Sequence, residues 1–388
     1  MGVHFINNWR KYMFLIERAI GIGCFYLALF LNSYLFSYVK GKQYKLILGF
    51  YLLILCIFAF IFEPYKTSDL YRLRYYMQTW VNYDWDDMLY YAFNRSDPIW
   101  IIFSYLTNLL GNINWLQTIS CFCGMALLFN VLSDLVQRFE LKLGEKGLLL
   151  FTALCSGDLF MGLIEGIRSP LGSIIIFYCI YKEIFENRNV LIDLPLYIIA
   201  AGLHSFTLVL VLIRFFFLAI QGKNAVSRIL AVAISIAVIA FILLKGQFYI
   251  LAAIEKADNY TNNIEEYTYL WASVTAFLKI LLIVVLLVWL FKKITYKKEF
   301  IQFKSYAVLT AACAFISMIA ALFSFAVNVR MAIFTFYLAL PIFAMALRSN
   351  LKDTNSVVSY YSIKYLIIGI WLISMVRGYI CSYKFFVL

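Results

Sequence analysis

The chain has 388 residues, of which 64% are hydrophobic and 14% are charged, and its net charge is +12. Soluble domains are about half apolar and a quarter charged, so this composition excludes a soluble enzyme, a nucleic-acid-binding domain and a disordered chain. A membrane-crossing helix needs about 20 apolar residues, and the apolar residues are enough for about twelve such helices. We therefore predict an all-α polytopic integral membrane protein: a single membrane domain over 1–388 with about 11–14 transmembrane helices, short or re-entrant ones included.

Apolar runs predict these helices along the whole chain. In chain order they lie near 19–39, 44–62, 98–111, 114–136, 147–164, 170–186, 190–203, 204–220, 228–244, 269–291, 305–327, 331–347 and 364–382. The run 98–111 is short for a span and is expected to be re-entrant or interfacial. The pair 190–203 and 204–220 is expected to turn at His204.

Positive charges in the short loops predict the orientation, because Lys and Arg mark the cytoplasmic side. The loop 292–304 holds five lysines and is the strongest inside mark. Counting passes from it places two longer, acid-rich loops on the outer face. These are 63–97, which is expected to contain short helices, and 245–268.

A few ionisable residues at the outer ends of spans are the candidate functional groups, because charges at membrane depth are costly. Arg168 lies where one run ends and the next begins, and Arg330 lies between the runs 305–327 and 331–347. Either arginine is explained by a side chain that extends to the interface or by an anion clamp, since a planar guanidinium suits a phosphate. His204 is explained by a structural hydrogen bond or by a role as proton acceptor.

The loop 63–97 interleaves aromatic residues with charged ones. Aromatic rings cover the apolar faces of sugars and carboxylates accept hydrogen bonds from hydroxyls, so the pattern suits a carbohydrate, although interface aromatics are also ordinary in membrane proteins. Asp84 and Asp86 are explained either by a divalent metal or by a solvated acidic loop.

Four short motifs and one late arginine resemble those of the bacterial polysaccharide polymerases of the EpsG/Wzy family. Ser68-Asp69-Leu70-Tyr71, followed by Tyr75, resembles the family's Asp-Tyr element, and Asp97-Pro98 resembles an acidic-Pro element that is usually Glu-Pro. The match covers roughly residues 20–347, and its specificity lies in the order and spacing of the motifs.

The remaining motifs follow in the same order. Gly166-Ile167-Arg168 is similar to the Ile-Arg element, with Ser169 in place of the usual Gln. Leu203-His204-Ser205 is similar to the His element, which usually has an aromatic residue before the His, and Arg330 falls where a late Arg is expected.

The resemblance implies a glycosyltransferase, with a GT-C-like architecture, in the bacterial cytoplasmic (inner) membrane. Such polymerases join oligosaccharide repeat units carried on undecaprenyl diphosphate, at an active site on the outer or periplasmic face. The bond to diphosphate is already activated, so no nucleotide or ATP is required, and no cofactor and no metal are expected. The expected partners are the lipid-linked oligosaccharide, the bilayer, and a chain-length regulator and flippase of the same pathway, with no nucleic acid.

The resemblance and the residue types together assign roles. Arg168 and Arg330 would bind the diphosphate and stabilise it as it leaves, and His204 or Asp69 would take the proton from the attacking hydroxyl. The other substrate-binding candidates are Arg72, Arg74, Tyr71, Tyr75, Glu165 and Asp97.

Other functions remain open at this point. A glycosyltransferase that uses a polyprenyl-phosphate sugar would hold a metal at Asp84 and Asp86, and an O-antigen ligase would share the arginines but use another acceptor. A flippase for lipid-linked oligosaccharides is the alternative of another class, although such transporters usually show internal repeats. A structural partner of the export machinery is the weakest alternative.

Overall fold

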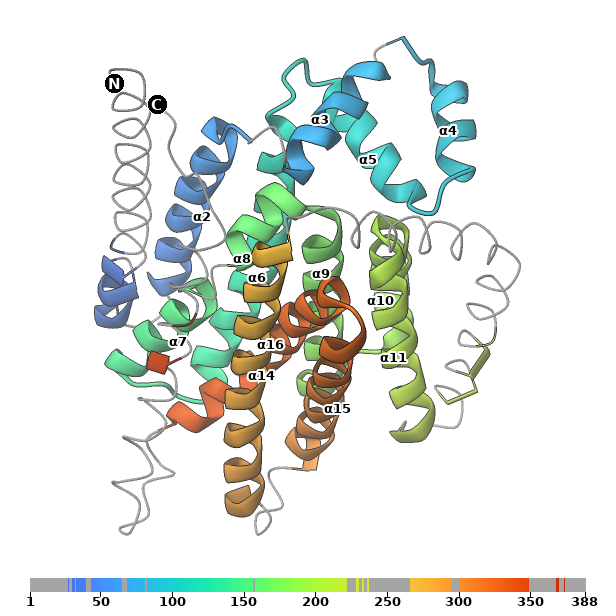
Figure 1. The fold of residues 1–388 in the computed structure, drawn as a ribbon. Helices are drawn as coiled ribbons and strands as arrows, with labels where there is room; N and C mark the ends of the chain where they lie inside the picture. The colour runs from blue at the N-terminus through green and yellow to red at the C-terminus, as the bar shows by residue number, and fades with distance from the viewer. Residues whose placement is uncertain are drawn as a thin grey trace, which may run out of the picture.

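The computed structural model describes residues 33–39, 43–64, 68–80, 82–155, 158–221, 266–294 and 301–348, together with a few isolated positions. In this part of the chain the secondary structure is helical, with no strand (Figure 1). The helices are α2 (Gln43–Ile61), α3 (Asp69–Thr79), α4 (Trp85–Phe93), α5 (Pro98–Asn108), α6 (Trp115–Arg138), α7 (Leu143–Cys155), α8 (Asp158–Met161), the π-helix η1 (Gly162–Gly166), α9 (Arg168–Phe185), α10 (Val190–Leu203), α11 (Ser205–Gln221), α14 (Glu266–Ile294), α15 (Ile301–Phe323) and α16 (Phe325–Leu347).

Five of the described helices are long and apolar enough to cross a membrane, which confirms a polytopic α-helical membrane protein. They are α2, α6, α14, α15 and α16. A sixth span results if α7 and the segment Leu159–Gly166, bent by 44° against each other, form one broken span. Most of the runs 19–39, 228–244 and 364–382 and almost all of the loop 245–268 lie outside the described residues, so the total of 11–14 helices stays a prediction.

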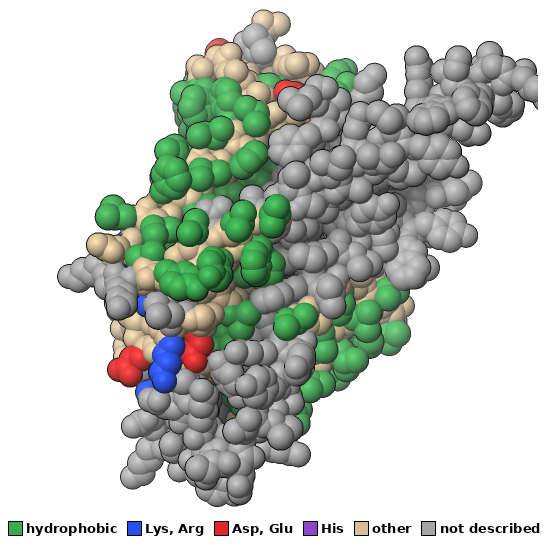
Figure 2. All heavy atoms as spheres, turned by 90° about the vertical axis from the view of Figure 1, so that its left-hand side faces the viewer, with side chains coloured by type: hydrophobic (Ala, Val, Ile, Leu, Met, Phe, Trp, Pro, Cys, Tyr) green, Lys and Arg blue, Asp and Glu red, His purple; other side chains and the backbone are tan. Residues whose placement is uncertain are grey.

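The bundle is built around α16, which packs against α14, α15, α9 and α7 and is buried over most of its length. On one side α2 packs against α6 and turns its other face outward. Figure 2 shows hydrophobic side chains along this side, a cluster of charged side chains toward the lower end and acidic side chains at the upper end. A broad apolar surface without charges is what a bilayer requires.

Short helices cover one end of the bundle. The predicted loop 63–97 contains α3 and α4, and the short run 98–111 becomes the 11-residue helix α5. Ser68 caps α3 and Asp84 caps α4, each by accepting a hydrogen bond from a backbone N–H three residues later. In Figure 1 these helices lie at the top, whereas α14 ends and α15 begins at the opposite end.

The turn between the predicted spans 305–327 and 331–347 lies earlier than the sequence pattern places it. We expect a break near Arg330, but α15 ends at Phe323 and Ser324 caps α16, so Arg330 lies in the second turn of that helix. The prediction is wrong because Asn328 is polar but fully buried. Its side chain bonds Ser273 of α14 and Ser317 of α15 inside the bundle.

Candidate functional site

An ion pair between Arg168 and Asp97 joins two motifs that lie 71 residues apart in the sequence. Arg168 is the first residue of α9, and its Nη1 donates to Asp97 Oδ2 at 2.7 Å. Asp97 precedes α5, and Pro98 begins that helix without losing a hydrogen bond because the first N–H groups of a helix have no intrahelical partner. The Arg168 side chain stays 28% exposed, so its remaining N–H groups are accessible to an anion.

Trp100 adds an aromatic surface beside this ion pair. The Arg168 guanidinium lies over its ring, 5.9 Å from the centroid, in a cation–π contact. The sequence does not distinguish Trp100 from other aromatic residues, because apolar runs in a membrane protein are rich in them. The one sequence feature that links Trp100 to Asp97 is their spacing of three residues, since residues i and i+3 share a helix face.

Glu165 lies in the helix that precedes α9, three residues before Arg168. It is in the π-helix η1, which packs against α3, and it is half-buried. The carboxylate of Asp69, the first residue of α3, is close enough to act on Glu165 electrostatically. Asp69 in turn pairs with Arg72 on the exposed face of α3. Such exposed pairs contribute little stability, so Arg72 is available to a phosphate.

His204 forms the predicted turn between α10 and α11 and is buried. Its Nδ1 accepts a hydrogen bond from the backbone N–H of Phe206 at 2.9 Å, so the ring caps the start of α11. A neutral imidazole whose Nδ1 accepts carries its proton on Nε2. In this arrangement His204 is a hydrogen-bond donor, which argues against its predicted role as proton acceptor.

Two glycines allow the helices that flank His204 to pack closely against the helices that carry the Asp97–Arg168 ion pair. A Cβ at Gly202 would lie 2.6 Å from Cγ1 of Ile99 in the first turn of α5, and one at Gly172 would lie 2.5 Å from Thr207 of α11. Only glycine leaves room for these two side chains at such short distances. The last turn of α10 therefore lies against the start of α5, and the second turn of α9 lies against the start of α11.

Arg74 belongs to the framework of the fold. Its Nη1 donates to Glu63 at 2.9 Å, and its Nη2 donates to the Phe62 carbonyl at 3.1 Å and to the Asn114 side chain at 2.7 Å. Burial lowers the pKa of Arg74, and the Glu63 carboxylate opposes that shift. Because these bonds tie α3 to the end of α2 and the start of α6, we assign Arg74 a structural role instead of the expected substrate contact.

Arg330 is half-buried in α16, apart from the short helices. Its helix contacts α9 through the stacked rings of Phe177 and Tyr337, whose centroids are 6.0 Å apart. The structure therefore places the two candidate arginines on neighbouring helices, and a joint site for them stays a prediction.

The tyrosines of α3 are open to solvent. Tyr71 and Tyr75 are exposed on the same helix that carries Asp69 and Arg72. Exposed rings next to an ion pair form a surface suited to a sugar, whose apolar face can lie on an aromatic ring.

The possible metal site at Asp84 and Asp86 gains no support. The Asp84 carboxylate accepts the Asp87 N–H at 2.8 Å as the cap of α4, and both side chains are exposed. Among the described residues, no group of three or more His, Cys, Asp or Glu side chains is placed to hold a metal ion.

Comparisons with family models, with curated proteins and with solved structures found no match to this chain.

Proposed function

We propose that this membrane protein is a glycosyltransferase that polymerises oligosaccharide repeat units carried on undecaprenyl diphosphate, at the outer face of the bacterial cytoplasmic membrane. The observation that carries the proposal is the meeting of four motifs around the Asp97–Arg168 pair. The starts of α3, α5, α9 and α11 each carry one of these motifs, and they lie at the end of the bundle away from the end of α14 and the start of α15.

In this proposal the site acts mainly by charge. An acceptor hydroxyl attacks the anomeric carbon of the donor while the bond from that carbon to the diphosphate oxygen breaks. Arg168 stabilises the departing diphosphate with the N–H groups that Asp97 leaves available, and Arg330 assists from α16. Preorganised donors of this kind often contribute more to the rate than any other feature of an active site. Arg72, Tyr71 and Tyr75 bind the incoming lipid-linked unit.

Reconstitution tests the proposal. The purified protein in liposomes is given an undecaprenyl-diphosphate repeat unit with or without EDTA, and the products are separated on a gel. We expect a ladder in both lanes. No ladder in either lane would contradict the polymerase, and transfer of a single sugar that EDTA abolishes would favour the metal-dependent alternative.

The first variant to test is Arg168→Ala. Loss of one donor to a developing charge lowers kcat by about 10²–10³, or roughly 2.7–4 kcal/mol, and we expect a loss of this size. Arg95→Ala is the matched control, because Arg95 is an exposed arginine at the same end that contacts the ring of Tyr91. Equal activity of the two variants, with equal melting temperatures, would rule out the role of Arg168.

A further inference from the structure

We propose that Glu165 is the general base that removes the proton from the attacking hydroxyl. This inference rests on the proposed function and assigns one chemical step within it. The sequence places Glu165 only among the substrate-binding residues, with His204 or Asp69 as the base.

The position of Glu165 supports this role. It lies near the end of a π-helix, a rare conformation that occurs mostly as single turns and frequently at functional sites. Arg168 begins the next helix three residues later, so the carboxylate and the diphosphate-binding guanidinium lie on the two sides of one junction. The side chain is half-buried, which leaves part of it accessible to a substrate.

The other candidates for the base are less well placed. Asp97 holds Arg168 at 2.7 Å, whereas Asp69 lies on the exposed face of α3, open to water beside Arg72. His204 accepts a backbone N–H at Nδ1 and therefore presents a proton, not a lone pair, at Nε2. Among the residues that the structure describes, no hydrogen bond or ion pair engages the Glu165 carboxylate.

The charges around Glu165 fit a base that must hold a proton during the reaction. Asp69 of α3 raises the negative potential at Glu165, which favours uptake of a proton. Arg168 is held by Asp97, which offsets part of its positive charge at the junction.

The step balances. The acceptor hydroxyl oxygen forms the new bond to the anomeric carbon, its proton moves to Glu165, and the electron pair of the breaking bond leaves with the diphosphate. The departing diphosphate is already an anion and needs no proton, so one base is sufficient.

Azide provides a direct test, because it is an anionic nucleophile that needs no base. The experiment measures polymer and glycosyl azide formed by the wild type, Glu165→Gln and Arg168→Ala from the lipid-linked repeat unit. We expect Glu165→Gln to lower kcat for the polymer by about 10²–10⁴ with little change in KM, and to form glycosyl azide of inverted configuration at a rate close to the wild type. Arg168→Ala is expected to lose both polymer and glycosyl azide formation, because the departing diphosphate is not stabilised whichever nucleophile attacks.

The outcomes separate the two proposals. Wild-type protein that forms no polymer contradicts the proposed function itself. A wild-type ladder together with full polymer activity in Glu165→Gln overturns only the role of Glu165. Loss without azide rescue also overturns it, because a binding or structural residue would give that result. Glycosyl azide of retained configuration would assign Glu165 as a nucleophile and equally overturn the base.

Discussion

Two fully buried amides differ in their hydrogen bonding. Asn328 bonds Ser273 and Ser317, with its Nδ2 2.5 Å from Ser273 Oγ and its Oδ1 3.1 Å from Ser317 Oγ. Gln117 of α6 is equally buried, yet in the described part of the chain neither its Nε2 nor its Oε1 has a partner. A buried amide without partners opposes folding, whereas a paired one contributes to it.

We therefore expect substitutions of the two amides to change stability in opposite directions. Gln117→Leu removes an unsatisfied group and should raise the free energy of unfolding by about 1–3 kcal/mol. Asn328→Leu should lower it by about 1–3 kcal/mol, since it removes the side-chain bonds to both serines and leaves Ser317 only the backbone carbonyl of residue 328. Unfolding in mixed detergent micelles, followed by circular dichroism, measures both. A loss of stability in Gln117→Leu would show that a water or another partner satisfies the amide.

At the scale of single residues, the sequence indicated where chemistry could occur but not how the groups pair. Charged residues in apolar surroundings are conspicuous, so Arg168 and Asp97 were identifiable. Their ion pair was not, because it depends on how two helices 71 residues apart pack. The protonated Nε2 of His204 likewise depends on the backbone N–H of Phe206, which only the geometry of the turn reveals.

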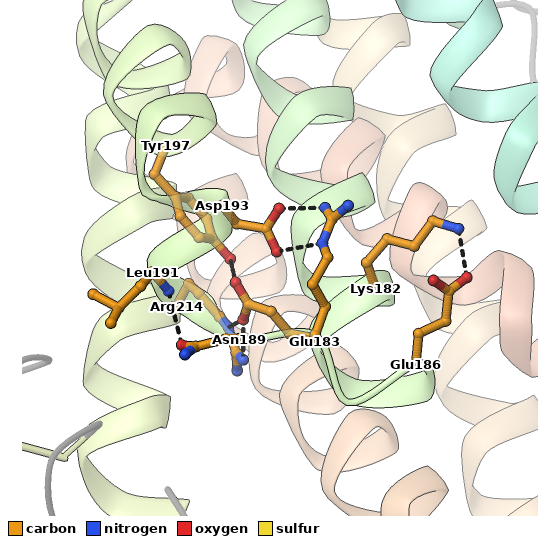
Figure 3. A network of polar contacts seen from close by, with 9 residues as sticks. Lys182, Glu183, Glu186, Asn189, Leu191, Asp193, Tyr197 and Arg214 are labelled. Atoms are coloured by element: carbon orange, nitrogen blue, oxygen red, sulfur yellow. Dashed lines mark hydrogen bonds and ion pairs between the residues drawn. The ribbon is translucent and has the colours of Figure 1, made fainter.

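At the scale of elements, a buried polar network joins α9, α10 and α11 (Figure 3). Arg214 of α11 donates from Nε to Glu183 of α9 at 3.0 Å, and Tyr197 of α10 donates to the same carboxylate at 2.9 Å. Near it, Arg188 donates from Nε to Asp193 at 2.9 Å. The network fixes the three helices whose opposite ends carry Arg168 and His204.

Breaking this network should destabilise the protein more than replacing it. Glu183→Leu leaves the buried charge of Arg214 without its partner and is expected to cost about 3–5 kcal/mol. The double variant with Glu183→Leu and Arg214→Met replaces both charges by apolar groups and should recover most of that loss. A double-mutant cycle from unfolding midpoints measures the coupling. Additive effects would show that the pair contributes no coupling energy.

Element boundaries followed from the sequence where turn chemistry agreed with the apolar pattern. The turn at His204 and the start of α5 at Pro98 are predicted correctly. The break at Ser324 is not, because Asn328 and Arg330 interrupt the apolar pattern although the helix continues through both. A polar residue bonded inside the bundle cannot be distinguished from a loop residue by composition.

At the scale of the whole molecule, the two ends of the bundle differ in chemistry. The end that carries α3, α4 and α5 presents exposed tyrosines and the candidate site. Helix α6 begins at this end beside Arg74 and leads to the other, where Lys142 precedes α7. The positive-inside rule predicts that the second end faces the cytoplasm, and the proposed chemistry requires the first end to face outward.

Labelling with a membrane-impermeant maleimide tests this orientation. Tyr90→Cys places a thiol at an exposed position of α4, and Lys142→Cys places one at an exposed position before α7. In spheroplasts we expect Tyr90→Cys to react and Lys142→Cys to react only after permeabilisation, because the bilayer separates the two ends. The wild type provides the background from the chain's eight cysteines. The reverse pattern would place Arg168, Asp97 and Glu165 in the cytoplasm and would contradict polymerisation at the outer face. Labelling of both positions in intact spheroplasts would contradict a bundle that crosses the membrane between α4 and Lys142.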